Sequence, residues 1–153
     1  MSDLVDTERM RVIVFTVHTH SFALPMKAVL KISPRPTQLH QGFDDVGLIE
    51  LDGQTVRLLV LEQSWAVDPL PDHPFLILVQ GGSDWILGIQ VAELPNMMEL
   101  DRASIQAIPE AARKTPLGSL CHYVALWHGE NDTPQPIFLL DLALTLKAHH
   151  TEA

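Results

Sequence analysis

The sequence predicts an all-β fold, of the barrel or sandwich type, with a few short helices. Apolar runs of strand length recur along the chain, separated by turn-forming residues that include 8 glycines and 11 prolines. No long stretch shows the helical periodicity of about 3.6 residues. Many short strands at regular spacing, broken by Gly and Pro, are typical of barrels and sandwiches. With 153 residues, the chain is long enough for one domain, or for two small ones that share a core.

The clearest local signal is a hairpin at residues 47–61. Asp52-Gly53 stands between two alternating apolar runs, where this dipeptide favours a tight β-hairpin turn. Pairing Leu51 with Gln54 sets the register. One face then carries the apolar residues Leu51, Ile49, Val56, Leu58 and Val60. The other face carries Glu50, Thr55 and Arg57 among leucines, so the hairpin is expected to pack inward on one side and present polar groups on the other.

The remaining elements follow from the same reasoning. Strands are expected at 11–17, 22–24, 75–79, 85–91, 95–100, 105–108, 120–128 and 137–140. A short helical turn is predicted after Pro25, a short helix at 62–68 around Trp65, and a surface loop or helical turn at 110–116. Polar loops are expected at 37–45 and 129–136. The predicted core comprises Ile13, Phe15, Leu24, Val56, Leu58, Ile77 and Ile89.

A proline-rich segment predicts the division of the chain. Pro69, Pro71 and Pro74 form a stiff linker between two halves. A shift of 63 residues lays Phe15 on Leu78 and Phe22 on Trp85, a faint repeat that favours two similar units. We therefore expect a flexible N-terminus at 1–10, a first barrel at about 11–68, a second at about 75–147, with exchange of strands between them allowed, and a tail at 148–153.

Composition and charge exclude several classes of function. The formal charge of −9 would be repelled by phosphate backbones, which argues against nucleic acid as a partner. The acidic start lacks the features of a signal peptide, and the apolar runs are too short to span a bilayer, so no membrane insertion is expected. A single cysteine, Cys121, excludes internal disulfides and fits the reducing cytoplasm.

Candidate catalytic and metal-ligating residues are few. His18 and His20 are two apart, so on a strand they would share a face and could begin a zinc or copper site, although an exposed hairpin end explains them better. Cys121 and His122 are adjacent, and adjacent strand residues point to opposite faces, which disfavours a nucleophile and base pair. The glycine-rich stretch at 81–84 lacks the lysine of a phosphate-binding loop. The sequence therefore predicts a non-enzymatic protein without a cofactor or metal.

Over residues 10–147 the chain resembles the CheW family of bacterial chemotaxis coupling proteins. Four motifs occur in the family's order: Phe22-Ala23-Leu24-Pro25, Val29-Leu30-Lys31-Ile32, the hairpin from Gly47 to Leu61, and Leu139-Leu140-Asp141-Leu142. The resemblance implies two packed five-stranded β-barrels. It also implies a cytoplasmic adaptor that joins a methyl-accepting chemoreceptor to a CheA-type histidine kinase. A small ligand- or metal-binding β-barrel is the alternative function.

The family pattern also bears on the C-terminus. Leu140, Leu142, Leu144 and Leu146 alternate with other residues, which locally predicts a strand. The family pattern instead begins a short helix near Asp141, which could cap it, and this is the expectation we adopt.

The resemblance implies a partner-binding surface around the hairpin. The expected residues are Val29, Ile49, Glu50, Leu51, Asp52, Gly53 and Arg57. The family has arginine where this chain has Asp52, and aspartates where it has Val60 and Ala92. Reversal of charge at the hairpin tip should exclude a partner surface built for arginine. The departures predict a specialised member, for example one that serves twitching motility (type IV pili) or another accessory system.

Overall fold

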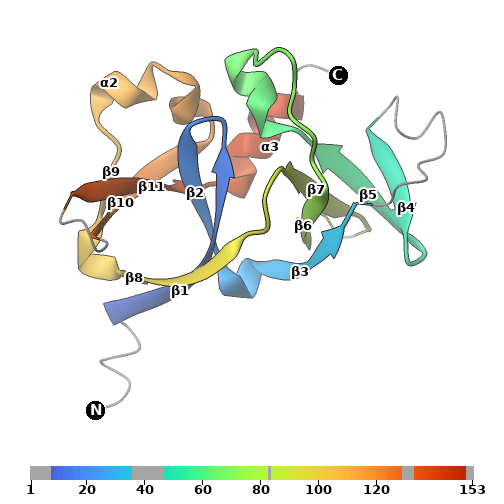
Figure 1. Cartoon of the computed structure of the whole chain (residues 1–153), viewed down its shortest axis with the longest axis horizontal. Coiled ribbons are helices and arrows are strands. Elements are labelled where there is room, and N and C mark those ends of the chain that lie inside the picture. Colours follow the sequence, from blue (N-terminus) through green and yellow to red (C-terminus); the bar gives the residue numbers. More distant parts are fainter. Residues whose placement is uncertain (1–7, 36–46, 83, 129–132, 151–153) are drawn as a thin grey trace. The chain divides into compact units, whose positions relative to one another are not determined.

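The computed structural model describes residues 8–35, 47–82, 84–128 and 133–150, with only the backbone at 148–150. The described chain is mostly β, with two sheets and a few short helices (Figure 1). Six strands form one sheet, in the order β8-β1-β2-β11-β10-β9, and five form the other, in the order β3-β6-β7-β5-β4. The predicted all-β class is confirmed, although one sheet has six strands rather than the expected five.

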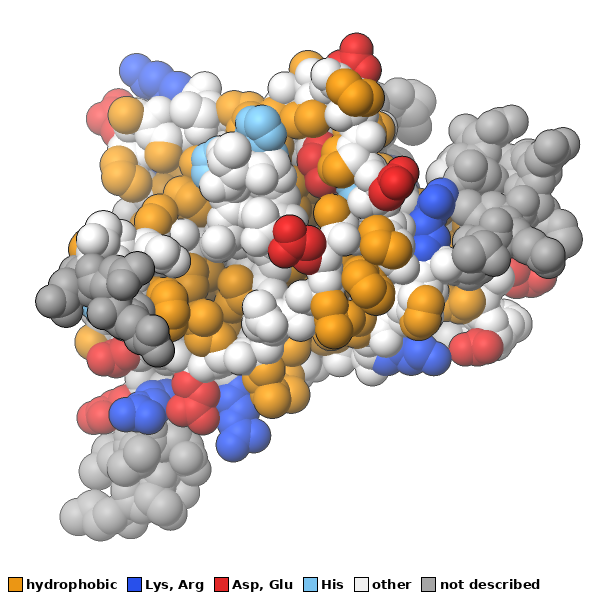
Figure 2. Space-filling model, viewed as in Figure 1, with side chains coloured by type: hydrophobic (Ala, Val, Ile, Leu, Met, Phe, Trp, Pro, Cys, Tyr) orange, Lys and Arg blue, Asp and Glu red, His pale blue; other side chains and the backbone are white. Residues whose placement is uncertain are grey.

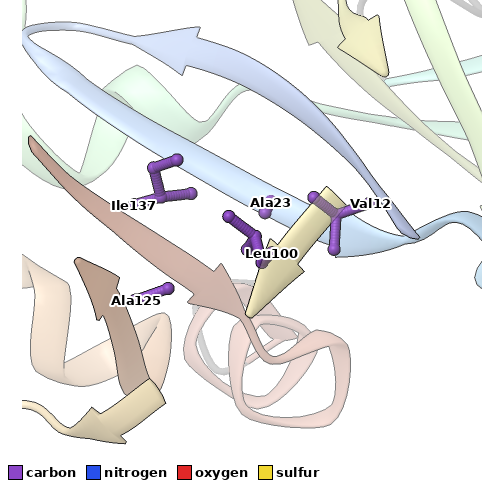
Figure 3. Close-up of a cluster of buried hydrophobic side chains, with 5 residues drawn as sticks. All are labelled: Val12, Ala23, Leu100, Ala125 and Ile137. Carbon is purple, nitrogen blue, oxygen red and sulfur yellow. The ribbon is translucent and has the colours of Figure 1, made fainter. Parts of the chain in front are cut away.

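The six-stranded sheet joins strands from both ends of the chain. Its strands are β1 (Arg9–Val17), β2 (His20–Pro25), β8 (Asn96–Asp101), β9 (Ile105–Ala107), β10 (Cys121–His128) and β11 (Pro134–Leu140). β11 runs parallel to β2, whereas β1 with β8, β10 with β11, and β10 with β9 pair antiparallel. Five strands contribute the small buried cluster drawn in Figure 3: Val12, Ala23, Leu100, Ala125 and Ile137.

The five-stranded sheet contains the hairpin that the sequence predicts. Its strands are β3 (Val29–Pro34), β4 (Leu48–Leu51), β5 (Gln54–Leu59), β6 (Phe75–Gln80) and β7 (Ile86–Val91). Leu51 pairs with Gln54 and Ile49 with Val56, as expected. Asp52 and Gly53 have φ of 51° and 80°. Positive φ at both central residues is the type I′ conformation that Asp-Gly favours.

The buried side chains agree with the predicted core except at one position. Ile13, Phe15, Leu24, Val56, Ile77 and Ile89 are all less than 9% exposed. Leu58 is only partly buried and packs against the cluster of Ile49, Val56 and Leu76. Gly88 is needed at the centre of this sheet, because a Cβ there would lie 2.8 Å from Val56 Cγ1.

The strands divide between the sheets differently from the predicted division at the prolines. β6 and β7 follow the proline-rich segment but pair with β3 and β5. β1 and β2 pair with β8 and β11 from the C-terminal part. The two compact units are accordingly residues 27–95 with 16–18, and residues 1–15 and 19–26 with 96–153. The linker is thus an internal connection of one sheet, because strand pairing rather than proline content sets the grouping.

The two sheets repeat one arrangement. The order β8-β1-β2-β11-β10 in one sheet corresponds to β3-β6-β7-β5-β4 in the other. In each order the first strand is antiparallel to the second, the second and third strands are consecutive in the chain, and the fourth strand is parallel to the third. β11 is parallel to β2 as β5 is parallel to β7. The β4–β5 hairpin therefore occupies the place in its sheet that the β10–β11 hairpin occupies in the other.

The short helices lie close to their predicted places, except η3, which was not predicted. They are η1 (Met26–Ala28), η2 (Leu61–Trp65), η3 (Arg102–Ser104), α2 (Glu110–Arg113), η4 (Pro116–Ser119) and α3 (Leu142–His150). The Leu144 N–H donates to Asp141 Oδ1 at 2.8 Å, so Asp141 caps α3 and the alternating leucines are helical. The helix continues to residue 150, so the predicted tail from 148 begins too early. The predicted loop at 37–45 lies outside the described residues.

Candidate functional site

The β4–β5 hairpin forms an edge of its sheet. Among the described strands β4 pairs only with β5, and β3, at the opposite edge, pairs only with β6. The corresponding strand in the other sheet, β10, is instead covered by β9. Edge strands present unpaired backbone N–H and C=O groups, which can bind another chain. In the described part of the chain, β4 therefore lacks the further strand neighbour that β10 has in β9.

An ion pair connects the hairpin tip to the opposite edge of the sheet. Lys31 Nζ on β3 lies 3.5 Å from Asp52 Oδ2. The two side chains are 55% and 78% exposed, so water screens their attraction. The Asp52 carboxylate at the tip, which the resemblance places in the partner-binding surface, thus has a cation beside it in the same chain.

A β-bulge next to Lys31 exposes an apolar side chain. Val29 pairs with Val79 and Lys31 with Leu78, so Leu30 is an extra residue opposite two consecutive partners. Bulges re-aim side chains, and the Leu30 side chain is 52% exposed. Sequence reasoning missed both Leu30 and Lys31. The signal was present in the strand, where two consecutive apolar residues, Val29 and Leu30, interrupt the alternation of apolar and polar positions.

The structure separates the expected partner-binding residues into three groups. Glu50, Asp52 and Gly53 are exposed at or near the tip. Val29, Leu51 and Arg57 are half-buried, and Leu51 packs partly against the core cluster. The Ile49 side chain is 3% exposed within that cluster, so it supports the hairpin from inside. Alternation turns it inward beside exposed Glu50, and its expected part in partner binding stays a prediction.

The two histidines that the sequence offered as weak metal-ligand candidates do not share a strand face. His18 lies in the turn between β1 and β2 with φ of 56°, and its ring lies 6.0 Å from that of Trp65. His20 begins β2, and its ring contacts that of Phe138, with centroids 5.7 Å apart. Because His18 is in a turn, the period-two argument does not apply to this pair. Within the described residues no group of three or more His, Cys, Asp or Glu is placed to hold a metal ion.

Cys121 and His122 have separate surroundings. The Cys121 side chain is fully buried, and this burial, aided by the charge of Asp141, raises its pKa to about 12. A thiol with that pKa stays protonated at neutral pH and is a poor nucleophile. His122 is exposed, with Nε2 3.7 Å from Asp141 Oδ2. A surface hollow of about 600 Å³ adjoins both residues, but its chemistry does not include a reactive thiolate.

A buried polar pair was not predicted. Glu62 Oε2 on η2 lies 3.1 Å from His73 Nε2 in the proline-rich segment, and the two side chains are 3% and 7% exposed. Glu62 Oε1 is buried without a hydrogen-bond partner. The pair ties the proline-rich segment to the helix after the hairpin. The sequence offers no local signal for it, because the partners are 11 residues apart across several prolines.

Comparison with known proteins assigns the family. The model of the CheW-like domain matches residues 11–148. The chain belongs to the CheW-like domain family. The crystal structure of the scaffolding protein TtCheW from Thermoanaerobacter tengcongensis is similar in fold, with a TM-score of 0.64 at 15% identity over 86% of this chain and 88% of that chain. No curated protein sequence matches the chain.

Exposed hydrophobic side chains of this CheW-like chain can be seen on one face of the molecule in Figure 2. On the face shown in Figure 2, hydrophobic side chains reach solvent in several groups separated by charged and other polar side chains. Large hydrophobic side chains that are exposed include Met26, Leu30, Leu70, Leu94, Met97 and Tyr123. No helix in the described part of the chain is long and apolar enough to cross a membrane.

Proposed function

We propose that this protein is a non-enzymatic cytoplasmic adaptor in a bacterial chemosensory system, which couples a methyl-accepting chemoreceptor to a CheA-type histidine kinase. Membership of the CheW-like family supports the adaptor class, since the family consists of scaffold proteins. The likeness in fold to a CheW scaffolding protein agrees with it. The raised pKa of Cys121 argues against an enzymatic function that uses this thiol as its nucleophile.

The observation that carries the proposal is the open edge formed by β4 and the hairpin tip. A protein that holds two partners must leave surface free for them. Among the described strands, β4 has no neighbour on its outer side, where Glu50 and Asp52 are exposed. Buried Ile49 and Val56 anchor the hairpin behind that edge. Because its buried side chains hold the hairpin in place, the exposed polar surface loses little conformational entropy when a partner binds.

The hairpin also supports a specialised partner. An anion at position 52, where the family pattern has arginine, changes the sign of charge that a partner meets at the tip. We therefore assign the protein to an accessory system, such as one that controls twitching motility, in place of an ordinary flagellar system.

Co-purification tests the coupling function. Purified protein should co-elute with the regulatory domain of a CheA-type kinase from the same organism, and with the cytoplasmic tip of a receptor from that organism. Addition of both should give a ternary complex of higher apparent mass. If neither protein changes its elution volume at concentrations of tens of micromolar (roughly the range of weak transient complexes), the coupling function is refuted.

A further inference from the structure

We propose that the surface hollow beside Cys121 and His122 is a binding site for a small organic anion, in which a carboxylate is attached to a flat apolar body. The volume of the hollow, about 600 Å³, lies in the usual range of pockets for small molecules. Its residues all belong to the compact unit that contains the six-stranded sheet. The inference goes beyond the adaptor function and does not depend on it, because such binding can be measured on this protein alone.

A β-bulge brings two neighbouring side chains to the hollow. Cys121 of β10 pairs with Leu140 of β11, and Tyr123 pairs with Leu139, so His122 between them is an extra residue. In a regular strand His122 and Tyr123 would point to opposite faces. Instead both are exposed and both line the hollow, with ring centroids 6.3 Å apart. Bulges re-aim side chains beside functional sites, and this one places an imidazole next to a phenol.

The hollow combines a buried apolar lining with an exposed aromatic ring. Ile108 and Cys121 line it and are 2% and 0% exposed. The Ile108 N–H donates to the His122 carbonyl at 3.0 Å, which holds the chain after β9 against the bulge. The Tyr123 side chain is 52% exposed and offers a ring face. A flat apolar body could therefore leave water on this lining and stack against Tyr123.

The charges that line the hollow favour an anion. Arg113 and His122 line it, whereas no aspartate or glutamate does. This differs from the whole chain, in which 19 acidic residues outnumber 10 lysines and arginines. Asp141, whose carboxylate lies 3.7 Å from His122 Nε2, is not part of the lining. No carboxylate of the described residues forms an ion pair with Arg113, so its guanidinium can bind a ligand carboxylate through two parallel hydrogen bonds.

Local hydrogen bonds hold the segment that carries Arg113. Thr115 Oγ1 donates to the Ala112 carbonyl at 2.6 Å and accepts from the Leu117 N–H at 3.2 Å. Gly118 lies where η4 meets the end of α2, and a Cβ there would collide with the Arg113 carbonyl oxygen. The site is thus largely formed before a ligand arrives, which lowers the entropic cost of binding.

Titration of the isotopically labelled full chain with sodium benzoate, followed by NMR, tests the site. We expect saturable shifts of the backbone amides of Ile108, Gly118 and His122, with a Kd of about 1 mM, since the ligand is small. Benzamide has the same ring without the charge. It should bind about fivefold more weakly, because hydrogen bonds to an ionised carboxylate are stronger than those to a neutral amide.

Three variants separate the contributions of charge and ring. Arg113→Gln should weaken benzoate binding by about fivefold and leave benzamide binding unchanged. Tyr123→Leu should weaken the binding of both probes, because it removes the ring face. The matched control is Lys114→Gln, which removes an exposed cation at the next position, outside the lining. It should bind both probes as the unchanged protein does, and the unfolding temperature of every variant should stay the same.

Each contrary result refutes a stated part of the inference. If benzoate causes no saturable shifts up to about 20 mM, the hollow is not a site for such anions. Equal affinity for benzoate and benzamide would refute the preference for an anion, and unchanged affinities in Tyr123→Leu would refute the stacked ring. Equal losses in Arg113→Gln and Lys114→Gln would assign the binding to general charge attraction and overturn the site. All of these results leave the adaptor function standing, since neither the kinase nor the receptor takes part in the measurement.

Discussion

The β4–β5 and β10–β11 hairpins occupy equivalent positions in their sheets but have different edges. Each joins its sheet through a parallel pairing, β5 with β7 and β11 with β2. The outer strand of one, β10, is covered by β9, whereas the outer strand of the other, β4, has no further neighbour among the described strands. The same topology thus leaves the β4 edge without a further described neighbour, whereas the three-residue strand β9 covers the β10 edge.

This difference shows how a repeated arrangement can acquire one binding surface. The covered hairpin has longer strands, of 8 and 7 residues, whereas the open hairpin has strands of 4 and 6. A short edge strand limits unwanted pairing with other chains, and the charges at the tip add selectivity. The open hairpin is therefore suited to specific contact, and the covered one to holding its sheet together.

The largest change in the free energy of unfolding is expected from substitutions that create a cavity in either hairpin. Ile137 on β11 and Ile49 on β4 are each 3% exposed, so Ile137→Ala and Ile49→Ala remove the same atoms at equal burial. Each should lower the free energy of unfolding by about 2–5 kcal/mol. Ile49→Ala should lie near the lower end, because an edge strand can move to fill part of the cavity. Urea denaturation measures both, and a larger loss for Ile49→Ala would contradict the contrast between the hairpins.

The reactivity of Cys121 tests the closure of the covered hairpin. Burial raises its pKa from 9.0 to about 12, so at pH 8 the thiolate fraction should be about a thousandfold lower than in the unfolded chain. Alkylation by iodoacetamide should be correspondingly slow until denaturant is added. Because the folded thiol holds its proton more tightly, this contribution to stability is complete below pH 9 and is lost as pH rises toward 12. The Cys121→Ala variant should lose less unfolding free energy than the unchanged protein between pH 9 and pH 12. An equal loss of unfolding free energy in the two proteins would contradict the burial of Cys121.

A smaller effect is expected at the cap of α3, which follows the covered hairpin. Asp141→Ala removes the acceptor of the Leu144 N–H and should cost about 1 kcal/mol of unfolding free energy. Asp141→Asn keeps an oxygen that accepts this bond and serves as the control. Thermal unfolding followed by circular dichroism measures both variants. Equal destabilisation by the two would assign the effect to the lost charge, which also lies 3.7 Å from His122.

The smallest effect is expected at the exposed ion pairs. Lys31→Ala at the open hairpin and Arg11→Ala in the other sheet should each change the free energy of unfolding by less than about 0.5 kcal/mol, because both pairs are solvent-screened. Chemical denaturation at low and at high salt measures this. A loss above about 1 kcal/mol for Lys31→Ala alone would show that the pair closes the sheet structurally.

Features set by neighbouring residues could be predicted from the sequence. Asp52-Gly53 dictates the turn, the register of Leu51 with Gln54 follows from it, and alternation then assigns Val56 to the core. The grouping of strands could not be predicted in this way. The parallel pairings of β5 with β7 and β2 with β11 join segments far apart in the chain, and they leave no local pattern at either strand.

The binding surface shows the same limit. The resemblance directed attention to the hairpin and placed Asp52 correctly at its tip, but it also included Ile49, whose side chain is internal. The contact of Lys31 with Asp52 was not predicted, because the two residues are 21 positions apart in the sequence. Only the folded sheet brings β3 close to the hairpin tip. Glu62 and His73 were missed for the same reason, since burial of a charged pair depends on what covers it.

The exchange of the N-terminal strands has a consequence for synthesis of the chain. The sheet of β3 to β7 is complete once residue 91 has left the ribosome. β1 lacks its partner β8 until residue 101 has emerged, and β2 lacks its partner β11 until residue 140 has emerged. The middle of the protein can therefore fold first, and the first hairpin waits with Phe22 and Leu24 uncovered. During that interval the nascent chain exposes a hydrophobic segment that chaperones can bind. A chain truncated before residue 96 would contain all five strands of one sheet, but its β1 and β2 would lack their partners in the other.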